Sequence, residues 1–505
     1  MSLVDQFLGI DVGTSGVKAV LVDEKGEVQA SATSPLTLLT PKPGWAEQRP
    51  EDWWSATRQA VRRLMKPKRG RAPRVGAVGL SGQMHSSVFL DRKCAVVRPA
   101  LLWCDGRTTA ECQEITARVG EDNLRQWTCN PALEGFTLPK VLWLRKHEPA
   151  AFARVDKIVL AKDYIRYRLT GALATEPSDA SATLMYDTAH GRWSRPLLQA
   201  VGLHEGLLPD VGASAEVLGL VTTAAARATG LPVGTPVVGG GADNACGAAG
   251  VGAVSPGDAV ASWGTSGTVL APMATPKVDP SLRAHTFRHV LPDTWYVMGV
   301  MLTAGGAFAW HRRELARELS RKKDADALLN QEAARIPVGA EGVTFLPYLQ
   351  GERTPHRDAS ARGAVVGLTL AHTRAHLTRA VLEAICFGLR DSLTIVRDLG
   401  LPLSTLLLTG GGARSPYIRK LQAEVYGLPV VTVNREEGPA YGAALLAAVG
   451  AGAFKDLPAA CHATLRRNKP ESPRPGAHEA YDEPYRRFRE LYPALKTMAG
   501  DPALR

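Results

Sequence analysis

The sequence predicts an α/β protein built from two domains, and three observations support this. The chain has 505 residues, whereas a single hydrophobic core stops growing at about 250 to 300 residues. Strand-like and helix-like segments alternate along it, as in α/β folds. Residues 11–23 and 262–273 both carry a Gly-Thr-Ser turn followed by an apolar run, which favours two similarly built halves. We place the boundary near residues 245–258, giving domains over 1–250 and 251–505.

Composition and cysteine usage predict a soluble globular protein of the cytoplasm. Hydrophobic residues make up 45% of the chain and charged residues 22%, which is typical of proteins with large cores. The seven cysteines are scattered and never spaced as CxxC, so neither a disulfide framework nor a zinc site is indicated. The N-terminus lacks a basic flank before a long apolar core, and no apolar stretch reaches about 18 residues. We therefore expect neither export nor a membrane span.

The formal net charge of +11 alone would allow an acidic partner such as nucleic acid or a phosphorylated ligand. The basic residues are nevertheless spread along the chain, with small concentrations only at 62–74 and 466–474. No RNP-like motif or zinc-finger spacing accompanies them. We expect these to be solvated faces that raise the local concentration of an anionic ligand, and we do not expect a nucleic-acid partner.

In the first half, three segments have clear patterns. The apolar run 7–13 predicts a buried strand, and 17–33 predicts two strands joined by a turn at Lys25 and Gly26. Residues 50–64 predict a helix with Pro50 near its start. The chain therefore begins with a hairpin-rich sheet.

Near the middle of the chain, residues 236–254 and 258–273 both show an apolar strand, a glycine turn and a second apolar strand. Apolar residues recur at three- and four-residue steps over 375–399, which predicts a core-facing helix. Residues 405–433 predict a strand, a glycine turn, a helix and a strand. Residues 485–495 are helix-like, and the end of the chain beyond them is expected to be mobile.

The turn after the first strand is a candidate phosphate-binding loop. Its glycines allow close approach of the backbone, its hydroxyls and N–H groups can bond phosphate oxygens, and its acid can hold Mg²⁺ or its waters. An ordinary tight hairpin turn explains this motif equally well. The motif comprises Asp11, Gly13, Thr14, Ser15, Gly16 and Lys18.

Two later segments extend this pattern. The first repeats the same chemistry about 250 residues further on, and two matching hairpins could grip a polyphosphate from both sides. The second lies between a strand and a helix, where absent side chains leave room for a ribose or a flat ring beside a helix N-terminus, although a plain connecting turn explains it equally well. The segments are Gly264, Thr265 and Ser266, and Gly410, Gly411, Gly412 and Ala413.

In this order the three segments resemble the phosphate-1, phosphate-2 and adenosine motifs of the actin, Hsp70 and sugar-kinase superfamily. Residues 135–149 and 363–384 resemble the two signature stretches of the FGGY carbohydrate kinase family. The resemblance covers roughly residues 7–450 and is strongest to members that phosphorylate D-xylulose, through five further segments: 81–85, 99–107, 161–171, 239–252 and 345–356. It implies two ribonuclease-H-like domains with an active-site cleft between them, and ATP-dependent phosphorylation of D-xylulose with Mg²⁺. It is also compatible with a homodimer, for which the sequence identifies no interface.

The resemblance implies roles for three polar residues. Asp243 corresponds to the base that accepts a proton from the sugar hydroxyl, and Asn244 could bond a second hydroxyl. Local sequence alone would equally make Asp243 the cap of a helix over the following residues. Asp11 resembles the carboxylate associated with Mg²⁺, which is needed for turnover.

Further sugar contacts are implied by the same comparison. Met84 would offer an apolar surface and His85 a hydrogen bond, whereas without the resemblance both would be read as ordinary core or surface residues. If they face the cleft, Trp103 would form an aromatic wall and Asp105 would accept a hydrogen bond from a sugar hydroxyl. If they do not, Trp103 is a packing residue and Asp105 caps a turn. Two departures bear on sugar specificity: Cys104 stands where the family more often has Asn, and Ser86 and Ser87 replace a common Gly-Ala pair.

One further motif is expected to have a structural role. Glu352, Arg353 and Thr354 are expected to organise the second domain near the hinge, or to form a helix-linked salt bridge.

Rival functions are a kinase for another ketose or polyol, such as ribulose, fuculose, glycerol or erythritol, and a non-catalytic sugar or ATP sensor on the same scaffold. A nucleic-acid binder rests on charge alone.

Overall fold

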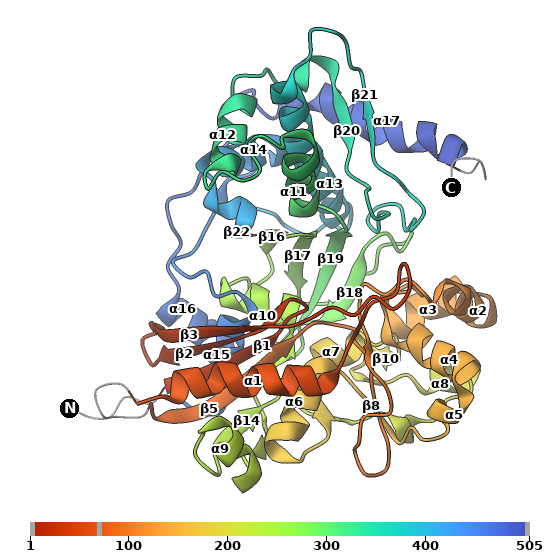
Figure 1. Ribbon diagram of the computed structural model, residues 1–505, viewed down its shortest axis with the longest axis vertical. Coiled ribbons are helices and arrows are strands. Elements are labelled where there is room, and N and C mark those ends of the chain that lie inside the picture. Colours follow the sequence, from red (N-terminus) through yellow and green to blue (C-terminus); the bar gives the residue numbers. More distant parts are fainter. Residues whose placement is uncertain (1–5, 68–72, 500–505) are drawn as a thin grey trace.

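The computed structural model describes residues 6–67 and 73–499. Within them, one sheet has seven strands and another has six, and Figure 1 shows each at the centre of its own lobe. In spatial order the first sheet contains β13 (Val217–Leu220), β14 (Pro236–Val238), β5 (Val75–Gly82), β1 (Gln6–Val12), β2 (Gly16–Asp23) and β3 (Val28–Pro35), with β15 (Gly241–Ala242) also paired to β5. The second contains β18 (His285–Arg288), β19 (Trp295–Met301), β17 (Gly267–Met273), β16 (Asp258–Trp263), β22 (Thr405–Gly410) and β23 (Val430–Val431).

The two sheets share one topology. In the first, β1 is antiparallel to β2 and parallel to β5, and β5 is parallel to β14. In the second, β16 is antiparallel to β17 and parallel to β22, and β22 is parallel to β23. The prediction of an α/β chain with two similarly built halves is therefore confirmed.

Most of the predicted elements are present. The opening strands are β1, β2 and β3, and the glycine-containing unit of the second half is β22, a short 3-10 turn, α14 and β23. The predicted helices are α1 (Pro50–Met65), α13 (Arg374–Asp398), α14 (Pro416–Tyr426) and α17 (Asp482–Ala499). The mobile C-terminal end was expected beyond α17, where residues 500–505 lie outside the described part of the chain.

The prediction of a second apolar strand within residues 236–254 was wrong. There, β14 and the two-residue β15 are followed by the helix α10 (Asp243–Gly250). A run rich in glycine and alanine has no clear strand or helix period, so its pattern did not decide between them. Its small side chains suit a helix that packs very closely against another helix.

That other helix is α15 (Pro439–Gly450), which lies on β1 and β5 of the first sheet although it comes late in the chain. A Cβ atom at Gly442 would lie 1.9 Å from the Cys246 carbonyl oxygen, and one at Gly250 would lie 2.6 Å from the Gly438 carbonyl oxygen. Only glycine at these positions lets the backbones of α10 and α15 come so close.

The two lobes also meet at β18 and β19. Asn130 donates from Nδ2 to the Thr286 carbonyl oxygen at 2.7 Å, and the Trp295 indole donates to the Thr188 carbonyl oxygen at 2.7 Å.

The domain boundary near residues 245–258 stays a prediction. The last strand of the first sheet, β15, ends at residue 242, and the first strand of the second sheet, β16, begins at residue 258. In the described part of the chain, no helix has the length and apolar character needed to cross a bilayer.

Candidate active site

The two predicted phosphate loops occupy equivalent places in the two sheets. One connects β1 to β2 and the other connects β16 to β17. Each hairpin is closed by one backbone bond, from Gly13 N to the Gly16 carbonyl oxygen at 3.1 Å and from Gly264 N to the Ser266 carbonyl oxygen at 3.0 Å. Ser15 is exposed at the tip of the first hairpin, so its hydroxyl is available to a ligand.

The second loop is held against the helix α11 (Gly305–Leu315). The Thr265 carbonyl oxygen accepts hydrogen bonds from the backbone N–H groups of Ala304 and Gly306, both at 2.9 Å. The Gly264 carbonyl oxygen accepts another from Gly305 at 2.9 Å. The loop therefore has a fixed position relative to α11.

The glycine-rich segment after β22 packs directly on the same hairpin. Gly410 has a φ of 80°, and a Cβ atom there would lie 2.4 Å from the Trp263 carbonyl oxygen. A Cβ atom at Gly412 would lie 2.5 Å from the Trp263 ring. Both positions therefore require glycine, and Ala413 follows them, buried, in the same turn.

A cavity of about 960 Å³ lies where these segments meet. Its walls come from the second loop, α11, α12 (Ala325–Ala333), the glycine-rich segment and the start of α14. It contains four of the residues predicted to bind ATP, namely Gly264, Thr265, Gly411 and Gly412. This volume is sufficient for a nucleotide base and ribose.

Asp243 is the first residue of α10 and is half-buried. Its Oδ1 accepts hydrogen bonds from the Asn244 backbone N–H at 2.7 Å and from Asn244 Nδ2 at 3.0 Å. Desolvation, and to a lesser extent the carboxylates of Asp11 and Asp179, raises the pKa of Asp243 to about 8. A carboxylate with this pKa is a stronger base than an ordinary aspartate, and it is predominantly ionised only above about pH 8.

Asp11 lies near Asp243 at the end of β1, and Lys18 is its partner in the β1–β2 register. Desolvation raises the pKa of Asp11 to about 6, against the charge of Lys18. Asp11 Oδ1 is buried and has no hydrogen-bond partner among the described residues. An ionised oxygen in this state suits a metal ion or a metal-bound water.

Met84 and His85 follow β5, beside the start of α10. Asn244 donates from Nδ2 to the sulfur of Met84 at 3.5 Å, and the Tyr296 hydroxyl lies 3.9 Å from the same sulfur. His85 Nδ1 donates to the Ala182 carbonyl oxygen at 2.5 Å, and burial lowers the pKa of His85 to about 3. His85 is therefore neutral, and Nε2, for which no described residue is a hydrogen-bond partner, is left as an acceptor.

Trp103 and Asp105 differ in their surroundings. Trp103 is half-buried, and its indole donates to the Thr14 hydroxyl at 2.9 Å, which joins it to the first loop. Asp105 is fully buried, and its carboxylate accepts the Ala46 N–H at 2.6 Å and a two-pronged pair from Arg107 at 2.7 and 2.8 Å. These bonds favour the turn-capping role for Asp105 over contact with sugar.

Several residues around the base carry no signal in the sequence. Ser178 accepts a hydrogen bond from the Ala242 N–H at 2.9 Å, immediately before Asp243, and itself donates to Glu176 at 2.8 Å. Asp179 acts on Asp243 through its charge, and Tyr296 lies against Met84. These residues are distant from Asp243 in the chain and carry no local motif, so only the fold brings them together.

Comparison with known proteins agrees with this geometry. Residues 6–250 match the N-terminal domain, and residues 259–451 the C-terminal domain, of the FGGY family of carbohydrate kinases. The chain is 38% identical to a xylulose kinase of Bacillus subtilis (strain 168) over 97% of each chain. It is 40% identical to a xylulose kinase of Escherichia coli (strain K12) over 97% of this chain and 99% of that one.

A solved structure shares the fold. The crystal structure of a xylulose kinase from Rhodospirillum rubrum superposes with a TM-score of 0.90 at 34% identity, covering 98% of this chain and 100% of that one. Together with two lobes of shared topology and the arrangement of loops and carboxylates, these matches identify the chain as a member of the FGGY family of carbohydrate kinases.

Proposed function

We propose that this protein transfers the γ-phosphoryl group of ATP to D-xylulose, giving ADP and D-xylulose 5-phosphate. The observation that carries the proposal is the half-buried Asp243 carboxylate, with its raised pKa and with Asn244 and Met84 beside it. The names of the relatives support D-xylulose as the sugar.

The chemistry that Asp243 supports is general base catalysis. The sugar hydroxyl oxygen forms a bond to the γ-phosphorus while the bond from that phosphorus to the β,γ-bridging oxygen breaks. Asp243 accepts the hydroxyl proton, and ADP carries away the electron pair of the broken bond. A positioned base of this kind contributes about 10² to 10⁴ in rate.

Neighbouring residues would place the sugar for this step. Met84 offers an apolar surface to the C–H face of the sugar, and His85 Nε2 accepts a hydrogen bond from a hydroxyl. Asn244 carries an amide that can bond a second hydroxyl, and Trp103 contributes an aromatic wall beside Thr14. We include Asp105 only as a support for this wall.

ATP would be held by three segments. The hairpin loops at Gly13–Lys18 and Gly264–Ser266 offer backbone N–H groups and hydroxyls to the phosphates. The cavity beside Gly410–Ala413 accepts the adenosine. We also propose that Mg²⁺ enters with ATP and is held by its phosphates and by Asp11, whose unpartnered oxygen fits a site of one carboxylate plus phosphates and waters. When bound, this ion neutralises charge that develops on the β- and γ-phosphates.

One observation keeps another ketose or polyol in consideration. Ser86 and Ser87 are fully buried, and their hydroxyls bond to Gln83 and to the His85 carbonyl oxygen, so these two departures point into the protein. Cys104 is exposed beside Trp103, where the family more often has an amide. Any difference in sugar preference would therefore come from the surroundings of Cys104.

The test is ADP release with Mg·ATP across D-xylulose, D-ribulose, L-xylulose, L-ribulose, L-fuculose, glycerol, xylitol and no sugar. The proposal predicts selective stimulation by D-xylulose. Preference for another sugar would retain the kinase and replace the substrate. Release that no sugar stimulates would favour the sensor instead.

The state of the cysteines bears on the cellular setting. All seven cysteines are unpaired, which supports the reducing cytoplasm predicted from the sequence. A homodimer remains a prediction that a solution measurement of mass would test.

A further inference from the structure

An arginine of the second lobe lies against the wall of the candidate sugar site in the first lobe. Arg353 sits in a loop fixed to β19, because Thr354 donates its N–H to the Val300 carbonyl oxygen and its hydroxyl oxygen accepts the Val300 N–H, both at 2.9 Å. Glu352 strengthens this loop by accepting the Leu302 N–H at 2.9 Å and the Arg353 N–H at 2.8 Å. The backbone that carries the guanidinium is therefore held firmly.

The guanidinium reaches the first lobe beside Trp103. Arg353 Nη2 lies 2.7 Å from the point that a Cβ atom on Gly135 would occupy, and the Trp103 carbonyl oxygen lies 2.9 Å from the same point. A side chain at Gly135 would displace the arginine, so glycine at this position makes the contact between lobes feasible.

The guanidinium has no direct partner within the described chain. Among those residues, no hydrogen bond or ion pair to the side chain of Arg353 is present, so the salt bridge considered from the sequence is not formed. Arg357, four residues later, does pair with Glu121 at 3.1 Å. A guanidinium carries five N–H donors, and leaving them unmatched when partly buried is costly.

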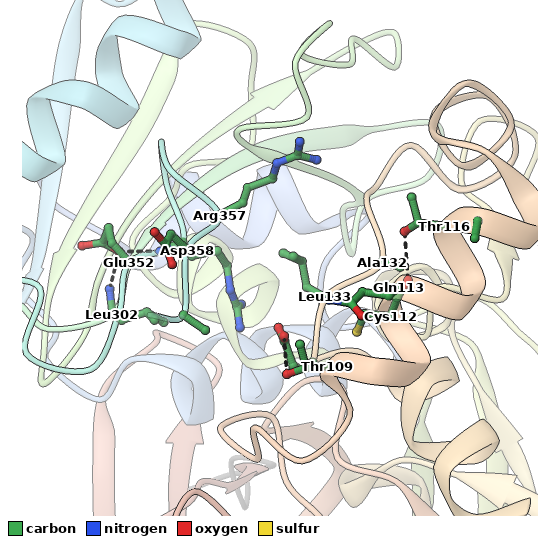
Figure 2. A pocket seen from close by; sticks show the side chains of 14 residues that line it. Thr109, Cys112, Gln113, Thr116, Ala132, Leu133, Leu302, Glu352, Arg357 and Asp358 are labelled. Atoms are coloured by element: carbon green, nitrogen blue, oxygen red, sulfur yellow. Dashed lines mark hydrogen bonds between the residues drawn. The ribbon is translucent and has the colours of Figure 1, made fainter. Parts of the chain in front are cut away.

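Arg353 also lines an open space between the lobes. This cavity of about 500 Å³ is bounded by α2 (Thr109–Val119) and residues 132–134 on one side and by residues 352–359 on the other (Figure 2). Its acidic neighbours are Glu134, which accepts the Thr109 hydroxyl at 3.0 Å, and Glu352, and neither forms an ion pair with Arg353 among the described residues. The donors of Arg353 can therefore serve a ligand that enters from this space.

The electrostatic field indicates which part of a ligand Arg353 would meet. Its charge contributes to lowering the pKa of His85 and acts on Cys104, both on the sugar side of the first lobe. Among nearby charges, Asp11 and Asp179 contribute most to the raised pKa of Asp243. Together with its position beside the Trp103 carbonyl oxygen, this indicates that Arg353 would meet the part of a ligand that lies against His85 and Trp103.

We propose that Arg353 is a sugar-specificity residue whose planar fork donates to the C1 hydroxyl and C2 carbonyl oxygens of the ketose. This rests on the proposed function. Because Met84 and His85 belong to the first lobe and Arg353 to the second, a bound sugar bridges the lobes. Sugar binding thereby favours the closed arrangement in which the catalytic geometry forms, and ATP hydrolysis without sugar stays slow.

The test compares Arg353→Met and Arg353→Lys with the wild type, and uses Arg357→Met as a control from the same cavity. For each, kcat and KM are measured with D-xylulose and with 1-deoxy-D-xylulose, alongside the KM for ATP and the melting temperature. We expect Arg353→Met to raise the KM for D-xylulose about 10²-fold and to discriminate less between the two sugars than the wild type does. Arg353→Lys should recover part of the loss, and Arg357→Met should behave as wild type with an unchanged KM for ATP.

Three outcomes would overturn the inference. An active wild type with an unchanged KM in Arg353→Met would remove the contact while leaving the proposed function intact. An equal loss on both sugars, or a matching fall in melting temperature, would make Arg353 structural. A wild type that D-xylulose fails to stimulate would refute the proposed function first, and this inference with it.

Discussion

The crossing of α10 and α15 predicts a strong effect of the smallest substitution, Gly442→Ala. The added Cβ atom would lie 1.9 Å from the Cys246 carbonyl oxygen, whereas van der Waals contact begins at 3.4 Å, so the helices would have to separate by about 1.5 Å. Overpacking of this kind costs about 1 to 3 kcal/mol. Since α10 begins with Asp243, the base would move with it, and a displacement of about 1 Å can cost 10²-fold in rate.

Gly247→Ala is the matched control, because it adds the same methyl group to α10 itself. There the nearest atom to the new Cβ is Pro439 Cγ at 3.7 Å, an ordinary contact. Replacing glycine by alanine inside a helix should then be neutral or stabilise by up to about 1 kcal/mol. Thermal melting and kcat for both variants test the reasoning, which fails if Gly442→Ala behaves as wild type or if Gly247→Ala is equally damaged.

Two further predictions concern the base and the nucleotide. An acid with a pKa near 8 is protonated and idle below that pH, so kcat/KM for the sugar should fall about tenfold per pH unit on the acid side. Asp179→Asn removes a like charge and should move this limb to lower pH; a pH–rate profile with an unchanged midpoint would contradict the assignment. Gly412→Ala places a Cβ atom 2.5 Å from the Trp263 ring and should weaken ATP binding about tenfold or more with the sugar KM preserved, whereas unchanged nucleotide titration would remove this segment from the site.

The sequence was sufficient for features that depend on local patterns. Apolar runs and glycine turns predicted β1–β3 and both hairpin loops, and the three- and four-residue period predicted α13. The helix that begins at Asp243 was considered only as an alternative to a strand, because its glycine and alanine residues have no distinctive period. Its close packing depends on Gly442, about 200 residues away.

Features that depend on contacts distant in sequence were not predictable. Ser178 reaches the backbone beside Asp243 only because the fold brings α7 (Pro177–Ser181) to β15. Arg353 lay in a motif that could be read as a salt bridge, and only its position beside Gly135 indicates a role at the sugar site. For Asp105 the structure removes a role. Sequence alone allowed its carboxylate to contact the sugar, whereas in the structure this carboxylate is paired with Arg107.

The central claim is that Asp243 accepts the proton of the sugar hydroxyl, and the most direct test is sugar phosphate formation by Asp243→Asn. ³¹P NMR would follow the product from Mg·ATP and D-xylulose, with nucleotide titration and thermal melting on the same samples. The account predicts a rate about 10² to 10⁴ lower than wild type, with ATP affinity and melting temperature preserved. Turnover within about tenfold of wild type would contradict it.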